Sequence, residues 1–156
     1  MIRLAKNSDI EKINQLLYQV HAVHAQGRPD IFKLGAKKYT SEELAEIIAD
    51  PCRPIYVYED EAGEIGGYVF CELQHTAENA SLMERRSIYI DDLCVDAEKR
   101  GGHIGTKLFD YVRDMAKEQG FDSVTLNVWS MNEGARRFYE KCGMHTLKTV
   151  MEYTVK

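Results

Sequence analysis

The sequence predicts one α/β domain in which a mixed sheet is flanked by helices. Two kinds of periodicity alternate along its 156 residues. Apolar residues recur at helical spacing in some segments, and between these lie short runs of β-branched and aromatic residues bounded by turn residues. We expect a single domain over residues 1–156, because no linker or repeat interrupts the pattern and the length suits one hydrophobic core. The predicted order of elements is β-α-α-β-β-β-α-β-α-β.

The first part of the chain is expected to hold a short strand, residues 2–5, and two helices. The Ser8–Glu11 pair has the spacing of a capping box, and apolar residues at helical spacing follow it. An irregular stretch, residues 25–38, separates this helix from the next. The second helix begins at the Thr40–Glu43 capping box and ends at Asp50-Pro51, because proline cannot continue a helix.

Three strands are expected in the middle of the chain. Two strands are expected at residues 55–59 and 65–73, and the turn at residues 60–63 joins them into a hairpin. The polar residues 75–86 are expected to form a loop. Residues 87–95 then read as the next strand, because β-branched and apolar residues dominate again.

The last third of the chain should alternate helices and strands. A helix over residues 105–119 ends at a glycine, and a strand over residues 123–129 follows it. Together with the preceding strand they make a β-α-β unit, which predicts a parallel strand pair at the centre of the sheet. Residues 132–142 form a helix with an asparagine at its start, and residues 145–155 are expected to be the last strand.

Residues 100–108, Arg-Gly-Gly-His-Ile-Gly-Thr-Lys-Leu, are the most informative segment of the chain. They lie between a predicted strand and a predicted helix, with glycines that leave the backbone accessible. The first N–H groups of a helix have no internal partner, and the helix dipole adds partial positive charge there. A phosphate or pyrophosphate satisfies both. The segment therefore predicts a site for a nucleotide-like cofactor.

The position of this turn argues against the two commonest nucleotide motifs. A dinucleotide fold has G-x-G-x-x-G after its first strand and an acidic residue at the end of the next strand. Here the turn follows the fourth predicted strand, and Asp122, about 20 positions on, begins a strand. A P-loop requires G-x-x-x-x-G-K-[ST], which Gly101 and Gly102 do not fit.

Two segments resemble the GNAT superfamily of acetyl-CoA-dependent N-acetyltransferases. Strand Ile90–Val95 followed by Arg100-Gly101-Gly102-His103-Ile104-Gly105 is similar to the family motif [QR]-x-x-G-x-[GA]. The run from Asn132 to Met144, Asn-Glu-Gly-Ala-Arg-Arg-Phe-Tyr-Glu-Lys-Cys-Gly-Met, is similar to N-x-x-[AG]-x-x-[FL]-Y-x-x-x-G-[FM]. The two motifs occur in order on the predicted elements, and the element order fits the family fold over nearly the whole chain.

The resemblance implies that acetyl-CoA binds in a cleft where two parallel central strands separate. The backbone of Leu93, Cys94 and Val95 is expected to pair with the pantetheine arm. The pyrophosphate is expected on the turn that consists of Arg100, Gly101, Gly102, His103, Ile104, Gly105 and Thr106. Asn132 is expected to contact the pantetheine or a bound water, or to serve purely as a helix cap. No metal site is expected.

His103 stands where the family motif has its first glycine. A side chain is tolerated there if its φ is negative and its ring points away from the cofactor. The ring could also donate a hydrogen bond to a phosphate. Both interpretations stay open at the level of sequence.

Tyr139 falls on the family's general acid, which gives a proton to the leaving CoA thiolate. The alternative is a core aromatic beside Phe138. The base is expected to be Asp91, since the segment Ser87–Asp92 resembles the diamine and polyamine acetyltransferases, whose catalytic carboxylate falls there. Strand alternation places Asp91 and Asp92 on opposite faces, so that one enters the cleft, and a β-bulge would change which one.

The expected activity is acetyl transfer from acetyl-CoA to a primary amine. The net charge of −5 and the paired aspartates favour a small cationic metabolite. A protein N-terminal or lysine acetyltransferase and a catalytically idle acyl-CoA-binding sensor remain alternatives. The acidic balance argues against nucleic-acid binding, and no apolar run is long enough to predict a membrane span. We expect a cytoplasmic protein with reduced cysteines, and a homodimer through the last strand stays open.

Overall fold

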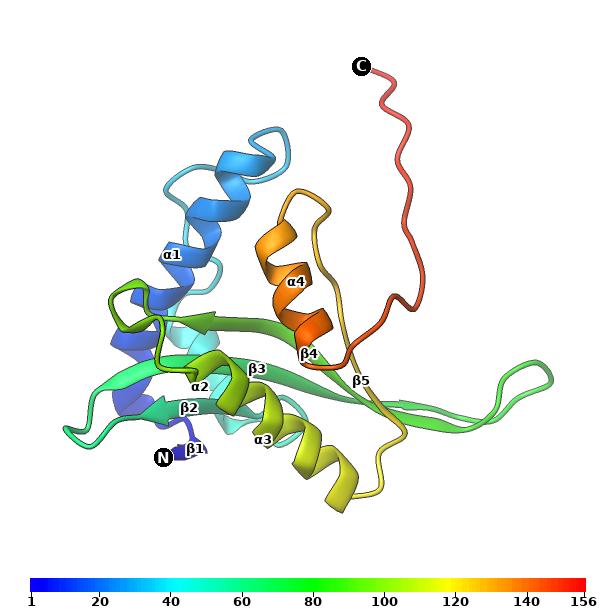
Figure 1. Cartoon of the computed structure of the whole chain (residues 1–156), viewed down its shortest axis with the longest axis horizontal. Helices are drawn as coiled ribbons and strands as arrows, with labels where there is room; N and C mark the ends of the chain where they lie inside the picture. Colours follow the sequence, from blue (N-terminus) through cyan, green and yellow to red (C-terminus); the bar gives the residue numbers. More distant parts are fainter.

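The computed structural model describes all 156 residues and confirms the mixed α/β sheet with flanking helices (Figure 1). Its strands lie in the order β1-β2-β3-β4-β5. Neighbours from β1 to β4 are antiparallel, and β4 and β5 are parallel, as the β-α-β unit predicts. Their bounds are β1 Ile2–Leu4, β2 Ile55–Glu59, β3 Ile65–Thr76, β4 Arg85–Val95 and β5 Ser123–Leu126.

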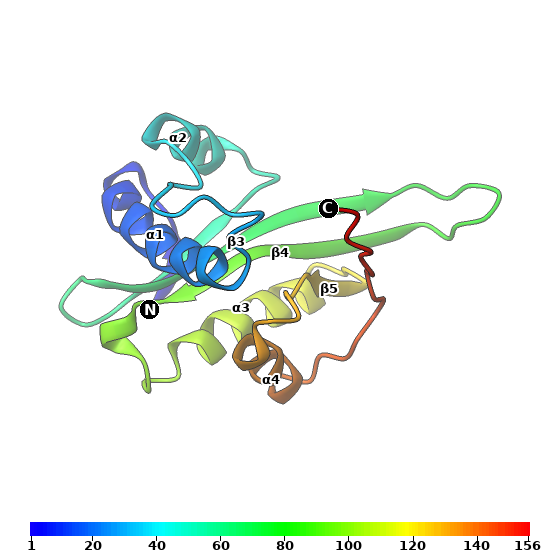
Figure 2. The ribbon, with the colours of Figure 1, turned by 90° about the horizontal axis from the view of Figure 1, so that it is seen from above.

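The helices form one layer on each face of the sheet (Figure 2). Helices α1, Ile10–Gly27, and α2, Ser41–Ala49, cover one face. Helices α3, Ile104–Glu118, and α4, Glu133–Lys141, cover the other. Each face has its own core, because alternate residues of a strand point to opposite sides. One-turn 3₁₀ helices precede α1 and α3.

The structure confirms one of the two predicted capping boxes. The backbone N–H of Glu43 donates to the Thr40 hydroxyl over 3.1 Å at the start of α2. The box expected at Ser8–Glu11 is wrong, because the carboxylate of Asp9 accepts from the backbone N–H of Lys6 at 2.7 Å instead. Asp9 is buried and pairs with Arg3 at 2.8 Å, which fixes the turn earlier in the chain.

Residues 77–84 form a loop, as the polarity of residues 75–86 predicted, but the loop is shorter at both ends than expected. Strands β3 and β4 continue as a paired hairpin as far as Thr76 and Arg85 and project beyond the sheet as an arm (Figure 1). Both faces of the arm are exposed, so apolar alternation is not needed there and backbone pairing alone maintains the strands.

Two further strand predictions need correction. Strand β5 ends at Leu126, three residues before the expected Trp129. Residues 145–155 form no strand within the chain: the segment runs extended past α4 and away from the sheet (Figure 1, red). No helix of the structure has both the length and the apolar character needed to cross a membrane.

Candidate active site

The turn between β4 and α3 is a cluster of free backbone donors. None of the N–H groups from Arg100 to Thr106 has an acceptor within the chain. Just before this turn, Asp96 caps the one-turn helix, and its carboxylate lies 2.5 Å from the Lys12 ammonium. Consecutive N–H groups at a helix N-terminus attract anions, and pairing with Lys12 neutralises the carboxylate beside them. The turn is thus suited to a phosphate-bearing ligand.

His103 adopts a conformation that the sequence did not lead us to expect. Its φ is +59° and its ψ is 24°, the left-handed region, so the negative φ named as a condition for tolerating a side chain at this position is not met. It is the one residue other than glycine with positive φ. Histidine enters this region more readily than most residues, and the turn into α3 requires it there. The ring is exposed and makes no hydrogen bond within the chain, so its role toward a phosphate stays a prediction.

Strands β4 and β5 separate beside this turn. They pair only from Ser87 to Ile90 on β4, so the edge of β4 from Asp91 to Val95 has no neighbouring strand on that side. Leu93, Cys94 and Val95 lie on this stretch. An extended ligand with amide groups can pair with such an edge as an added strand does. The separation expected from the resemblance is therefore present.

Helix α4 closes the other side of this gap. Asn132 caps it, accepting from the N–H of Ala135 at 3.1 Å, and its contact with pantetheine stays a prediction. Phe138 packs over the first turn of α3, where a side chain at Gly105 would place its Cβ 3.3 Å from the Phe138 ring. Gly105 therefore sets how closely α4 approaches the donor cluster.

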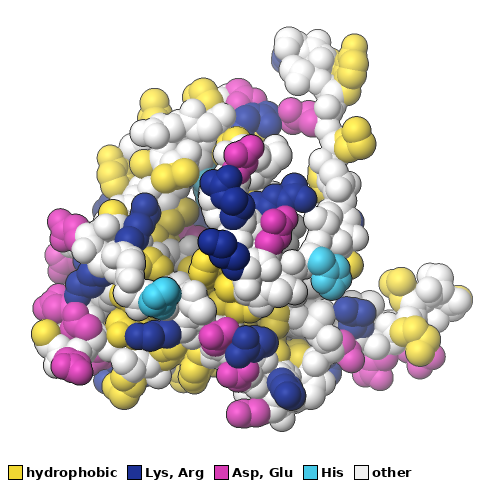
Figure 3. All heavy atoms as spheres, viewed as in Figure 1, with side chains coloured by type: hydrophobic (Ala, Val, Ile, Leu, Met, Phe, Trp, Pro, Cys, Tyr) yellow, Lys and Arg dark blue, Asp and Glu magenta, His cyan; other side chains and the backbone are white.

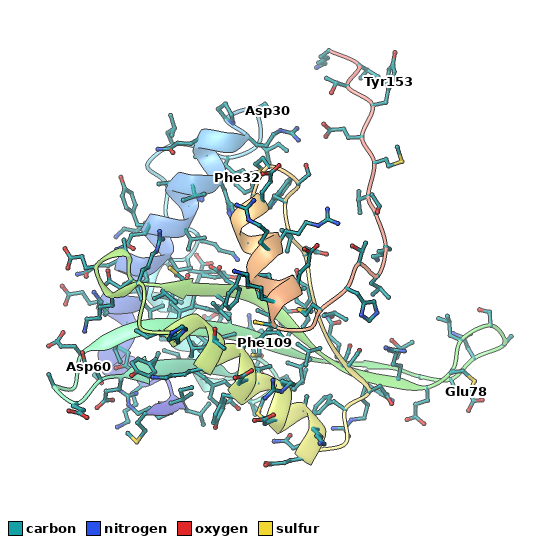
Figure 4. All side chains as sticks on the ribbon, in the orientation of Figure 1. Asp30, Phe32, Asp60, Glu78, Phe109 and Tyr153 are labelled. Atoms are coloured by element: carbon teal, nitrogen blue, oxygen red, sulfur yellow. The ribbon has the colours of Figure 1, made fainter.

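Tyr139 lies between α4 and α3, with its ring 6.2 Å from that of Phe109 and 5.0 Å from that of Phe138 (Figure 4, Phe109 labelled). Burial raises the pKa of its phenol well above the usual value, and the negative charge of Asp92 raises it further. Tyr139 is thus packed as a core aromatic, and the charge of a site carboxylate, Asp92, acts on its phenol. The two interpretations of this residue are compatible.

A β-bulge shapes the acidic end of β4. Phe70 lies opposite Asp92 and Cys71 opposite Ile90, which leaves Asp91 as an extra residue on β4. Before the bulge Ile90 packs on the α3 side, and after it Cys94 packs on the α1 side. The expectation that Asp91 and Asp92 point to opposite faces is therefore wrong, because the bulge resets the alternation and both carboxylates meet residues of the α1–α2 side.

The two carboxylates have different surroundings. Asp91 lies 2.9 Å from the Lys38 ammonium and accepts from the Tyr39 hydroxyl at 3.3 Å. Asp92 accepts from the Tyr68 hydroxyl at 2.8 Å. Burial raises the pKa of Asp92, and only part of this is offset by the charge of Lys38. The sequence alone did not single out Lys38, the last residue of the stretch described only as irregular, or Tyr39, which follows it.

Aromatic rings pack together near the end of α1. Phe32 lies between His24 and Trp129, with ring centroids at 5.2 Å and 5.3 Å (Figure 4, Phe32 labelled). Burial lowers the pKa of His24, with a smaller effect from the charge of Lys38. The ring of Phe32 thus joins the α1–α2 loop to the segment after β5. Sequence analysis did not single out Phe32, because nothing in its spacing marks it.

Comparisons with known proteins agree with this geometry. The model of the acetyltransferase (GNAT) family matches residues 17–144. The probable N-acetyltransferase san of Drosophila melanogaster is 36% identical over 110 residues, 63% of this chain and 56% of that protein. The zebrafish (Danio rerio) N-alpha-acetyltransferase 50 is 33% identical over 89 residues, 56% of this chain and 49% of that protein. This chain thus spans about half the length of these curated relatives.

A solved structure extends the likeness to the whole chain. A mutant of a Bacillus halodurans protein is 31% identical and superposes with a TM-score of 0.96, covering 100% of this chain and 99% of that one. The family model spans well over half of the sequence and includes both motifs around the donor cluster and α4. The chain belongs to the acetyltransferase (GNAT) family.

Proposed function

We propose that this protein transfers the acetyl group of acetyl-CoA to the primary amine of a small cationic metabolite. The observation that carries the proposal is the unpaired N–H run from Arg100 to Thr106 beside the free edge of β4. Phosphate oxygens fit the first and pantetheine amides fit the second. In the same proposal Asn132 lies beside the pantetheine arm, and the exposed Arg100 side chain adds charge for the phosphates.

Acetyl-CoA, when bound, supplies an acetyl thioester that an amine can attack directly. Residues of the chain then have to accept a proton from the amine and give a proton to the leaving thiolate. A free alkylammonium has a pKa of about 10.4, so only about one molecule in 10³ is neutral at pH 7. A carboxylate that holds the ammonium and receives its proton lowers this cost. We assign that role to Asp91.

The contact between Asp91 and Lys38 supports this assignment. A primary ammonium of the chain already lies 2.9 Å from Asp91, so this carboxylate has the exposure and geometry to receive an alkylammonium. The charge of the nearby Asp92 strengthens the attraction for a cation. A small cationic amine would displace Lys38 and take over its ion pair. The acidic pair thereby favours cationic acceptors over neutral ones.

Tyr139 is the proposed general acid. Its raised pKa keeps the phenol protonated at physiological pH, so that a proton is available when negative charge develops on the leaving sulfur. The packing of Tyr139 against Phe109 and Phe138 fixes the direction of its hydroxyl. A phenol positioned in this way typically contributes about 10²–10⁴-fold to rate.

An acceptor screen by CoA release tests the function. Spermidine-like polyamines and diamines should give turnover, and peptides with free N-termini should not. The reverse result would favour peptide acetylation, the second candidate, which the name of the zebrafish relative suggests. Acetyl-CoA binding without CoA release with any amine would mean that the protein is a sensor.

Matched variants test the residues. Tyr139→Phe should lower kcat at least 100-fold, whereas Tyr111→Phe, on the exposed side of α3, should leave it unchanged. Asp91→Asn should lower kcat/KM for cationic amines more than Asp92→Asn does. If Tyr139→Phe leaves the rate and its pH profile intact, the proposed acid is wrong. If Asp91→Asn lowers kcat/KM less than about threefold and Asp92→Asn lowers it far more, the base is Asp92 and not Asp91.

A further inference from the structure

A small hollow borders Asp91 between the sheet and the segments that flank α2. Its lining includes Tyr39, Arg53, Phe70, Glu72 and Asp91. The hollow has about 20 Å³ of room for a water-sized group, which is enough for one ammonium head. The carboxylate that we assign to the reacting amine therefore also borders a second space.

Glu72 brings a second carboxylate to this hollow. It lies on β3 opposite Tyr89, two residues before Asp91 on β4. Diagonal neighbours of this kind in an antiparallel pair are about 7–8 Å apart. The side chain of Glu72 is half-buried and has no ion pair or hydrogen bond within the chain. This carboxylate is thus free to bind a cation from outside the chain.

The positive charges nearby are already paired with other carboxylates. Arg53 lines the hollow, and its guanidinium lies 2.8 Å from the carboxylate of Asp50. The Lys38 ammonium pairs with Asp91 at 2.9 Å. Neither cation reaches Glu72, so the hollow keeps a negative charge that no group of the chain neutralises.

An aromatic wall adjoins the two carboxylates. The ring of Tyr39 stacks on that of Phe70, with centroids 6.0 Å apart and planes at 17°. The Lys38 ammonium lies 5.4 Å from the centre of the Tyr39 ring, so this ring already accommodates one primary ammonium. Aromatic faces pack against methylene groups, and carboxylates bind ammonium groups. The combination suits a chain of methylenes with a positive charge at each end.

Positive side chains gather on the other side of the sheet. Lys and Arg side chains lie over α4 on the face that Figure 3 shows (dark blue), and Arg136 and Arg137 of this helix are exposed. Such a face attracts an anionic cofactor and repels a cation. The hollow lies on the α1–α2 side of the sheet, the side of Phe70 and not of α4. The charge distribution therefore directs a cationic acceptor to the hollow.

We propose that Glu72 binds the second ammonium group of a diamine or polyamine acceptor whose reacting amine lies at Asp91. The inference rests on the proposed function, which places the reacting amine there. A chain of about four methylene groups spans a distance of the order that separates these two strand positions. Glu72 thereby selects acceptors that carry two charges over monoamines of the same length.

Steady-state rates with putrescine and butylamine test this selection, because butylamine has the same carbon chain without the second amine. The parent protein should prefer putrescine in kcat/KM by about tenfold. Glu72→Gln should remove the preference by raising KM for putrescine with little change in kcat, and it should leave butylamine unaffected. Glu72→Asp keeps the charge and should retain most of the preference.

A matched control removes a carboxylate elsewhere. Glu78 lies on the loop of the arm, far from the hollow (Figure 4, Glu78 labelled). Glu78→Gln changes the net charge by the same amount as Glu72→Gln, so it separates a local contact from a general effect of charge. It should leave the rates with both amines unchanged. An equal loss in the two variants would overturn the role of Glu72.

Calorimetric titration in the presence of CoA separates this inference from the proposed function. Putrescine should bind the parent protein more tightly than butylamine, and Glu72→Gln should weaken putrescine alone by about tenfold in Kd. If this difference is found and no amine gives turnover, the proposed function fails and the role of Glu72 stands. If Glu72→Gln is folded by circular dichroism and leaves Kd and KM for putrescine unchanged, Glu72 does not hold the second ammonium. Equal affinity of the parent protein for the two amines would refute the proposal as well.

Discussion

Replacement of His103 by glycine should stabilise the protein. The left-handed φ of +59° costs an ordinary L-residue about 1–2 kcal/mol, and glycine pays almost none of this. Glycine loses more chain entropy on folding, by about 0.5–1 kcal/mol, and histidine tolerates the region better than most residues. The net gain expected for His103→Gly is thus about 0.5–1 kcal/mol. For a chain of this length that is a rise in Tm of about 1–4 °C.

Urea unfolding followed by circular dichroism measures this change. His103→Ala is the matched control, because it removes the ring and keeps the Cβ, and it should be no more stable than the parent protein. Equal gains for alanine and glycine would show that the ring and not the backbone is the source of strain. Titration with acetyl-CoA gives the second readout. An unchanged or tighter Kd for His103→Gly means that the ring points away, and a tenfold loss means that it contacts a phosphate.

Three substitutions test other parts of the structure. Asp9 is held ionised by its bonds to Arg3, which lower its pKa, so its stabilising effect is present above about pH 4 and lost as pH falls further. Asp9→Asn should therefore cost about 1–3 kcal/mol at pH 7 and little at pH 2 in urea unfolding. The raised pKa of Asp92 has the opposite sign, so Asp92→Asn should gain stability at pH 7 and not at pH 3. A Cβ at Gly67 would lie 2.7 Å from the Cys94 carbonyl oxygen, so Gly67→Ala should lose about 1–3 kcal/mol. A Cβ at Gly134 on α4 would meet only the Asn132 side-chain oxygen at 3.9 Å, an ordinary contact, so Gly134→Ala should not destabilise. Equal stability of the two alanine variants would refute the close approach.

Local signals in the sequence were sufficient for most of the fold. Helix periodicity and the Thr40–Glu43 capping box located α2 correctly, and the two family motifs located α3 and α4. The predictions fail where residues distant in sequence determine the local structure. Asp9 displaces Ser8 from the cap because Arg3 lies beside it. Strands β3 and β4 continue past their expected ends because backbone pairing persists without an apolar face.

The candidate site likewise has features that the local sequence predicts and features that depend on residues distant in sequence. The donor cluster follows from glycines and a helix start, which are local features. The contacts of Asp91 with Lys38 and Tyr39 join positions 52 or 53 residues apart and have no local signature. The conformation of His103 was not predictable either, because only the path of the chain into α3 demands a positive φ there.

The bulge at Asp91 connects three properties of the site. Pairing of β4 with β5 ends at Ile90, the residue immediately before the bulge. A bulge bends its strand and increases the local twist, and this turns the edge from Asp91 to Val95 away from β5. The same extra residue brings both carboxylates to the side of Lys38 and Tyr68. A regular β4 would turn Asp92 to the α3 side, the side of Ile90, and would continue to pair with β5, which would close the edge proposed for the cofactor. One inserted residue therefore opens the cleft and places the acidic pair at its mouth.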